Sequence, residues 1–340
     1  MTQSLEFTAA TVESQQPENL QTLAVLWARK YYLSVASGQE RGQPQPKQNL
    51  TETTSIESKK KTANKLMQKL NLASAKAWSL TESLLGEEIQ RQDINPELIN
   101  PLEIATDTRE LFQKALDAYA SGIPPQRLSV MVGRNCGLVR QKYTSVDPRA
   151  IGFVSMQFHY TGQKLLEWLT LDEQKVFAPY LKVMDDHMYM PLQAAYEAAA
   201  QHDEDSPLLL AVQHLLPLST KIACEVCQSV SRQHPNYQSY SGALTAETVK
   251  ISSIRDVEMF QVYLCLCVLD RTIYSVQQQL FPLCVMLYPC LKVSWTLVQE
   301  MLLFMSWEIQ ERLPLQDVPI FHPYLRIFSE MFSQEVFQNE

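Results

Sequence analysis

The chain has 340 residues, of which 46% are hydrophobic and 19% are charged, and its formal net charge is −8. A chain of this length and apolar content can bury a large core, while its acidic balance disfavours whole-molecule attraction to DNA or anionic lipid. Only 9 residues are glycine. Because tight turns and phosphate-binding loops both need glycine, this scarcity argues against β-rich folds and nucleotide-binding α/β folds.

Apolar residues recur at intervals of three and four along most of the chain, a spacing that keeps one face of a helix apolar. We therefore predict an all-α globular bundle of about nine or ten helices. The predicted helices span residues 18–36, 55–92, 106–122, 126–143, 148–169, 171–201, 206–233, 254–281, 291–309 and 322–337.

The first part of the chain predicts a small unit ahead of the main body. A helix near residues 18–36 is followed by a segment, 37–55, in which glycine and proline lie among Gln, Asn and Thr. Such a composition buries little apolar surface and favours a flexible linker. We place an N-terminal helix with its linker in residues 1–54 and a helical main body in residues 55–340.

Residues 126–143 are compatible with two local structures. Gly133 and Gly137 could turn a short hairpin. A helix would instead place five apolar residues on one face: Leu128, Met131, Val132, Leu138 and Val139. We predict a helix, because the neighbouring segments are helical.

The segment 254–281 is predicted to be the central helix. Apolar residues follow a strict 3,4 spacing from Met259 to Leu280, and between Met259 and Leu269 the opposite face is apolar as well, apart from Gln261. A helix that is apolar on every side is buried. Prolines interrupt the repeat after about three heptads, so globular packing is expected rather than a long coiled coil.

The sequence lacks the common catalytic motifs. It contains no G-x-S-x-G, no P-loop and no G-x-G-x-x-G, and its six histidines leave little material for general-base chemistry. We therefore expect a protein without intrinsic catalysis and without a cofactor. The default function is protein–protein interaction, as an adaptor, assembly factor or regulatory subunit.

The strongest local charge lies in residues 127–149. Five basic residues are opposed there by Asp147 alone, which gives a local charge of +4. The five are Arg127, Arg134, Arg140, Lys142 and Arg149. Such a segment could bind an acidic partner, a phosphate or an RNA backbone, or it could pair with acids inside the protein. We predict recognition of an acidic partner surface, with RNA binding as an alternative.

His159, Asp186 and His187 form a second candidate site. They would converge if the two predicted helices that carry them were antiparallel neighbours, which is how helical bundles build metal and cofactor sites. The Glu-x-x-His pattern of di-iron bundles is missing, since Met156 and Met184 stand three residues before the two histidines. A metal- or cofactor-binding bundle is therefore kept as the alternative function.

The seven cysteines are the last group of candidate metal-binding or redox residues. Cys224 and Cys227 have the C-x-x-C spacing that could hold a soft metal or act as a dithiol. No glycine-rich knuckle surrounds them, so buried, reduced thiols are the expected state. The sequence shows no secretory signal and no uncharged apolar run of about 18 residues, from which we expect a cytoplasmic protein without a membrane span.

Overall fold

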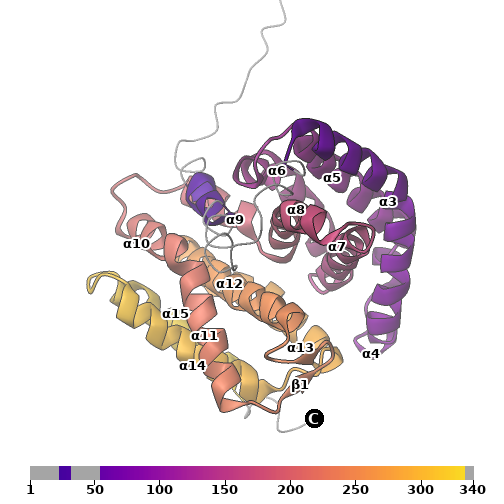
Figure 1. Ribbon diagram of the computed structural model, residues 1–340. Coiled ribbons are helices and arrows are strands. Elements are labelled where there is room, and N and C mark those ends of the chain that lie inside the picture. Colours follow the sequence, from indigo (N-terminus) through magenta and orange to yellow (C-terminus); the bar gives the residue numbers. More distant parts are fainter. Residues whose placement is uncertain (1–22, 32–53, 334–340) are drawn as a thin grey trace, which may run out of the picture.

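Thirteen α-helices, labelled α3 to α15, follow one another in the computed structural model, which describes residues 23–31 and 54–333 (Figure 1). Residues 23–31 are helical as well. The all-α class is therefore confirmed. The number of helices in this described part exceeds nine or ten, because several predicted helices are each divided in two.

The first half of the main body packs α3 against α5 and α7, and α6 against α8. Figure 1 shows this half gathered on one side of the molecule. Its elements are α3 (Ile56–Leu85), α4 (Glu88–Arg91), the 3-10 helix η1 (Pro96–Leu98), α5 (Pro101–Ala120), α6 (Pro125–Thr144), α7 (Ala150–Leu166) and α8 (Leu171–Tyr189). The prediction that 126–143 is helical is confirmed by α6.

The second half surrounds α12 (Glu247–Asp270), which contacts α9, α10, α11 and α15. The other elements are α9 (Leu192–Ala199), α10 (Pro207–Leu215), η2 (Leu216–Leu218), α11 (Ser219–Gln233), the π-helical turn η3 (Val276–Leu280), α13 (Phe281–Cys290), α14 (Trp295–Arg312) and α15 (Val318–Met331). Two short antiparallel strands, β1 (Gln238–Ser239) and β2 (Gly242–Ala243), form a hairpin before α12.

The central helix is confirmed as buried, but its predicted limits are wrong. Residues 257–269 of α12 are all buried, as expected for a helix with apolar residues on every side. The helix begins at Glu247 and ends at Asp270, because Arg271 adopts a left-handed conformation (φ 53°) that terminates it. The last two apolar positions of the repeat, Val276 and Leu280, lie in η3.

Proline explains other divisions. Met190 is extended and Pro191 follows it, so the predicted helix 171–201 is divided into α8 and α9, since a residue before proline avoids the helical conformation. At Pro217 the predicted helix 206–233 is divided by η2 into α10 and α11. The predicted helix 55–92, by contrast, continues without a break through Asn71, and α3 ends at Leu85, with Gly86 as its C-cap.

The described part of the N-terminal helix packs onto the main body. Leu23, Trp27 and Tyr31 are all buried in the common core, and Figure 1 shows the segment beside α9. The rest of this predicted helix and the predicted linker lie outside the described residues. The apolar face of the segment was thus predicted, whereas its contact with the main body was not.

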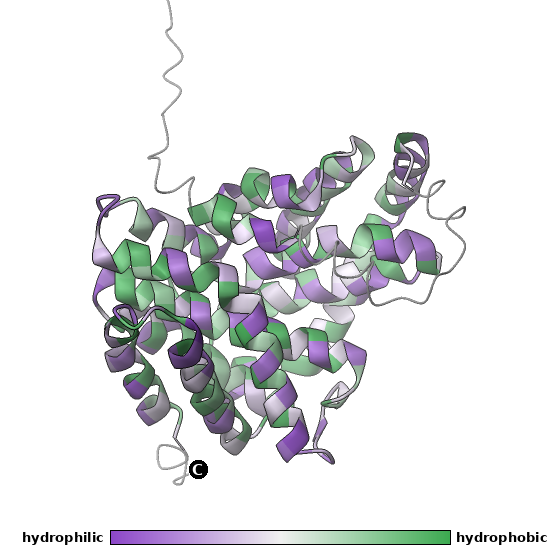
Figure 2. Ribbon diagram, turned by 60° about the vertical axis from the view of Figure 1, so that its left-hand side comes forward, coloured by the Kyte–Doolittle hydropathy of each residue, from purple (hydrophilic) through white to green (hydrophobic). Residues whose placement is uncertain are grey.

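Most helices carry hydrophilic residues along one side and hydrophobic residues along the other (Figure 2). Among the described residues, the run Pro207–Gln233, which comprises α10, η2 and α11, is long and apolar enough to cross a membrane by length and composition alone. Leu215, Ile222 and Val226 of this run are buried in the protein core.

Candidate functional site

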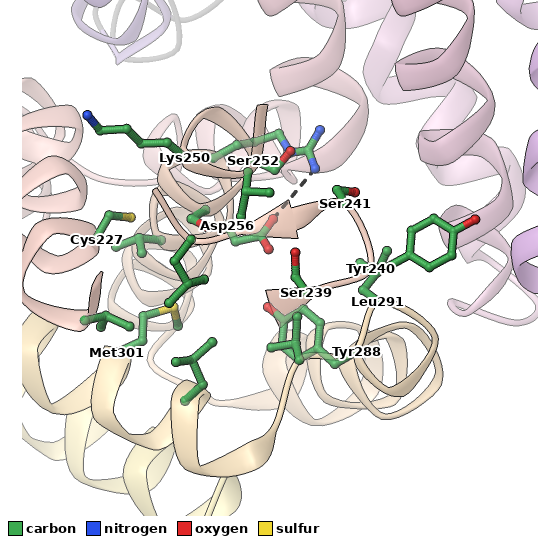
Figure 3. Close-up of a pocket in the computed structure, with 18 of the residues that line it drawn as sticks. Cys227, Ser239, Tyr240, Ser241, Lys250, Ser252, Asp256, Tyr288, Leu291 and Met301 are labelled. Atoms are coloured by element: carbon green, nitrogen blue, oxygen red, sulfur yellow. Dashed lines mark ion pairs between the residues drawn. The ribbon is translucent and has the colours of Figure 1, made fainter. Parts of the chain in front are cut away.

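A cavity of about 190 Å³ lies where α7 meets α11, α12, α13 and α14, next to the β1–β2 hairpin (Figure 3). We call it the Asp256 cavity. Its polar lining includes His159, Ser239 and Asp256. Its apolar lining includes Val226, Val230, Val257, Leu297, Val298 and Met301. A concave site that combines apolar side chains with convergent polar groups is typical of small-molecule binding.

Arg255 and Asp256, adjacent on α12, supply charge to this cavity. The Arg255 guanidinium lies over the Tyr189 ring, 3.7 Å from its centroid, and 3.3 Å from Oδ2 of Asp185. The guanidinium also lies 3.8 Å from Oδ1 of Asp256. This oxygen atom is buried and accepts no hydrogen bond from any described residue. Burial raises the pKa of Asp256 to about 6 in spite of the nearby arginine, because the charged form loses its hydration.

His159, on α7, lines the cavity but pairs with a different acid from the one predicted. Its Nδ1 lies 2.8 Å from Oδ2 of Asp185, and its Nε2 lies 2.9 Å from Nε2 of Gln163. These distances fit a ring that donates to Asp185 and accepts from Gln163. Asp186 is not part of this group.

Asp186 instead belongs to a buried charge cluster formed by Lys30, Lys182, Asp186 and Glu258. Lys30 Nζ lies 3.0 Å from Asp186 Oδ2 and 2.9 Å from Glu258 Oε2. Lys182 Nζ lies 3.0 Å from Asp186 Oδ1, and the Tyr31 hydroxyl donates to Asp186 Oδ2 at 2.9 Å. Two cations and two anions balance, and both carboxylates are fully buried.

His187 faces a third environment. Its Nε2 lies 2.8 Å from the Ser129 hydroxyl, and burial lowers the pKa of the ring to about 4. The predicted convergence of His159, Asp186 and His187 is therefore wrong, because successive residues on a helix point about 100° apart. Within residues 23–31 and 54–333, no group of three or more His, Cys, Asp or Glu side chains could hold a metal ion.

The basic segment does not form one continuous patch. Arg140 is buried inside the protein, where its guanidinium donates to the Met188 carbonyl and lies 3.5 Å from the Tyr263 hydroxyl. Such a side chain is already engaged in holding α6 to α8 and α12, so it cannot bind a partner without leaving the core.

Two further basic residues pair with acids of the same chain. Lys142 Nζ lies 2.7 Å from Glu103 Oε1 and 2.8 Å from Asp107 Oδ2, both on α5. Arg149 NH2 lies 2.7 Å from Asp147 Oδ2. Pairing of this segment with acids of the protein itself, the alternative to partner binding, therefore holds for these two residues.

The remaining arginines lie on an exposed surface that we call the α6 outer face. It consists of Arg127, Val130, Met131, Arg134 and Leu138. Met131 is 51% exposed and Leu138 is 54% exposed, although the sequence pattern predicted both on the buried side. That side carries Leu128, Val132 and Cys136 instead. The basic residues of this segment had predicted a binding surface, but the sequence pattern did not predict its exposed apolar residues.

The predicted C-x-x-C pair is divided between the surface and the core. Cys224 is exposed and Cys227 is buried, where burial raises the pKa of the Cys227 thiol. Burial also raises the pKa of Cys267 to about 12. All seven cysteines lie in the described part of the chain, and none forms a disulfide.

The Asp256 cavity and the α6 outer face are thus the two features whose side chains the fold alone does not explain. One combines a buried carboxylate with apolar walls, and the other combines exposed arginines with exposed apolar residues. Comparison of the chain with models of protein families, with curated proteins and with solved structures gives no match.

Proposed function

We propose that this chain is a non-enzymatic interaction protein that recognises an acidic, amphipathic helix of a partner protein through the α6 outer face. The observation that carries the proposal is the spacing of exposed residues on α6. Arg127, Met131, Arg134 and Leu138 recur at intervals of 4, 3 and 4 and alternate between basic and apolar types.

This spacing supports a helical partner. Positions three and four apart form one row along a helix, and two helices pack by interlocking such rows. A single exposed apolar side chain needs no explanation, but Val130, Met131 and Leu138 lie along one face of one helix. Methionine adapts to different partner surfaces, and arginine is enriched at protein interfaces.

Charge supports an acidic partner. Residues 125–144, which form α6, include no Asp or Glu, in a chain whose net charge is −8. An acidic partner would therefore be attracted to this face and repelled by most of the remaining surface, which favours one binding orientation. RNA binding has less support, because three of the five basic residues already make contacts within the protein.

A reducing, cytoplasmic setting is part of the proposal. It is supported by seven cysteines that form no disulfide, all in the described part of the chain. Most of these thiols are buried among apolar side chains, where they act as small core residues.

Site-specific photo-crosslinking tests the proposal. The full chain, with Met131→p-benzoylphenylalanine, is expressed in cells that naturally contain it, and the cross-linked peptide is identified by mass spectrometry. We expect one predominant partner, cross-linked through an acidic amphipathic helix. The double reversal Arg127→Glu/Arg134→Glu in the same chain should abolish this cross-link, because it replaces both attractive charges by repulsive ones.

The matched control is Arg232→Glu/Arg326→Glu, which changes the net charge equally on α11 and α15, away from α6. Both arginines are exposed, and among the described residues Arg326 forms an ion pair with the exposed Glu330. Equal cross-linking in the two double variants would contradict the proposal, as would a predominant cross-link to RNA. Far-ultraviolet circular dichroism verifies that each variant remains helical.

A further inference from the structure

We propose that the Asp256 cavity binds a small amphipathic amine, with the ammonium group on the Asp256 carboxylate and the apolar body against α11 and α14. This inference is independent of the α6 outer face. It concerns a different set of residues, and the ligand would be a small molecule instead of a protein.

The charges around the cavity favour a cation. Asp185 contacts both His159 (2.8 Å) and Arg255 (3.3 Å). Asp256, by contrast, has Arg255 as its only ion-pair partner among the described residues, at 3.8 Å. The Asp256 carboxylate therefore has no second cation at close range within this part of the chain. Lys250 does not correct this, because it is exposed and Figure 3 shows its ammonium group directed away from the cavity.

Beyond its 3.8 Å ion pair with Arg255, Oδ1 of Asp256 accepts no hydrogen bond from the described protein. Figure 3 shows the carboxylate directed into the cavity on the same side as the Ser239 hydroxyl. A buried carboxylate oxygen without a hydrogen bond is unfavourable. An ammonium group has three N–H donors, so it can pair with Asp256 while also donating to a serine hydroxyl. An anionic ligand would instead meet the same carboxylate.

One part of the lining fits an apolar body. Valine, leucine and methionine side chains from α11, α12 and α14 form this part of the wall, beside serine and tyrosine side chains, and they offer no hydrogen bonds to a ligand. The volume of about 190 Å³ is below the ~300 Å³ at which sites for drug-sized ligands begin. The ligand is therefore a small amine with a single apolar chain or ring.

Three probes with the same six-carbon chain isolate the contribution of the charge. Hexylamine, hexan-1-ol and hexanoate are titrated into the purified full chain by isothermal titration calorimetry at pH 7.5. We expect hexylamine to bind at least tenfold more tightly than the other two. Equal affinity for all three, or no binding of hexylamine, would overturn the proposal.

Two variants identify the site. Asp256→Asn removes the charge with little change of shape and should weaken hexylamine binding at least tenfold without affecting hexan-1-ol. Met301→Trp fills the cavity from α14 and should weaken both probes. Asp172→Asn is the matched control, because Asp172 is an exposed acid on α8 that pairs with the exposed Lys175. Retention of hexylamine binding by Asp256→Asn would place the amine elsewhere and refute the assignment.

Discussion

Asp256 is a residue whose ionisation opposes folding. Its carboxylate is largely buried, and burial raises its pKa from 3.8 to about 6. The charged groups that face it are Arg255 on the same helix and His159 on α7, while Cys227 and Tyr288 approach from α11 and α13. A carboxylate held in this way costs stability at neutral pH, which is common where a side chain is retained for binding.

We expect Asp256→Asn to stabilise the ligand-free protein at neutral pH but not at pH 4. In the unfolded chain Asp256 ionises near 3.8, whereas in the folded protein it ionises near 6. The native protein therefore loses stability as the pH rises between these values, by up to about 3 kcal/mol. The Asp256→Asn variant does not lose stability in this way, because asparagine does not ionise. Urea unfolding of both proteins at pH 4, 5, 6 and 7 measures the difference, and an equal difference at pH 4 and 7 would contradict the assignment.

Consecutive residues of α8 show why the sequence could not assemble a site. Asp185 pairs with His159, Asp186 joins the buried charge cluster, and His187 contacts Ser129. The chemistry of these residues was visible in the sequence, and so was the proximity of their helices. The rotation of each helix about its axis was not, because it depends on how all the neighbouring helices pack together.

Among the elements, the limits of α12 illustrate what apolar periodicity can and cannot predict. The repeat correctly indicated a buried central helix. It continued through the end of that helix at Arg271, because the next elements, η3 and α13, bury apolar residues at similar spacing. Helix ends depend on local backbone conformation, and an arginine in the left-handed region gives no sequence signal of the kind that glycine gives.

Replacing Arg271 by glycine should stabilise the protein. Arg271 has φ 53° and ψ 33°, and its N–H closes the end of α12 on the Cys267 and Val268 carbonyls. A non-glycine residue in this conformation costs about 1 kcal/mol, which glycine avoids. We expect Arg271→Gly to raise the free energy of unfolding in urea by up to about 1 kcal/mol. Arg271→Ala is the control, because alanine retains the backbone cost; an equal gain from alanine would show that the arginine side chain itself is unfavourable there.

At the scale of the whole molecule, the buried charge cluster joins three parts of the chain. Lys30 comes from the N-terminal helix, Asp186 from α8 in the first half and Glu258 from α12 in the second half. Burial acts to raise the pKa of Asp186, but the ammonium groups of Lys182 and Lys30 outweigh it and hold the pKa at about 2. Stability from this carboxylate is therefore present above about pH 4 and is lost as the pH falls towards 2.

The sequence could not reveal this cluster, because Lys30 and Glu258 are 228 residues apart. Predicting an N-terminal helix needed only its apolar face. Predicting where it docks required knowing that two acids in separate helices would share a buried region and need cations. Trp27 adds to the docking, since the Lys30 ammonium group lies 3.6 Å from the centroid of its ring, a cation–π contact that strengthens when desolvated.

Lys30→Met should destabilise the protein by about 3–5 kcal/mol, because among the described residues it leaves Lys182 as the one cation paired with Asp186 and Glu258, and an unmatched buried charge is costly. Lys30→Met/Asp186→Asn restores the balance of one cation and one anion, so the double variant should lose less stability than the sum of the two single variants.

Urea unfolding of the unchanged protein, the two single variants and the double variant measures this coupling. Because the carboxylates are buried, the coupling should persist in 0.5 M salt, where the Debye length is about 4 Å and interactions between exposed charges are strongly screened. Strict additivity would instead mean that apolar packing of Trp27 and Tyr31, and not charge, holds the N-terminal helix on the main body.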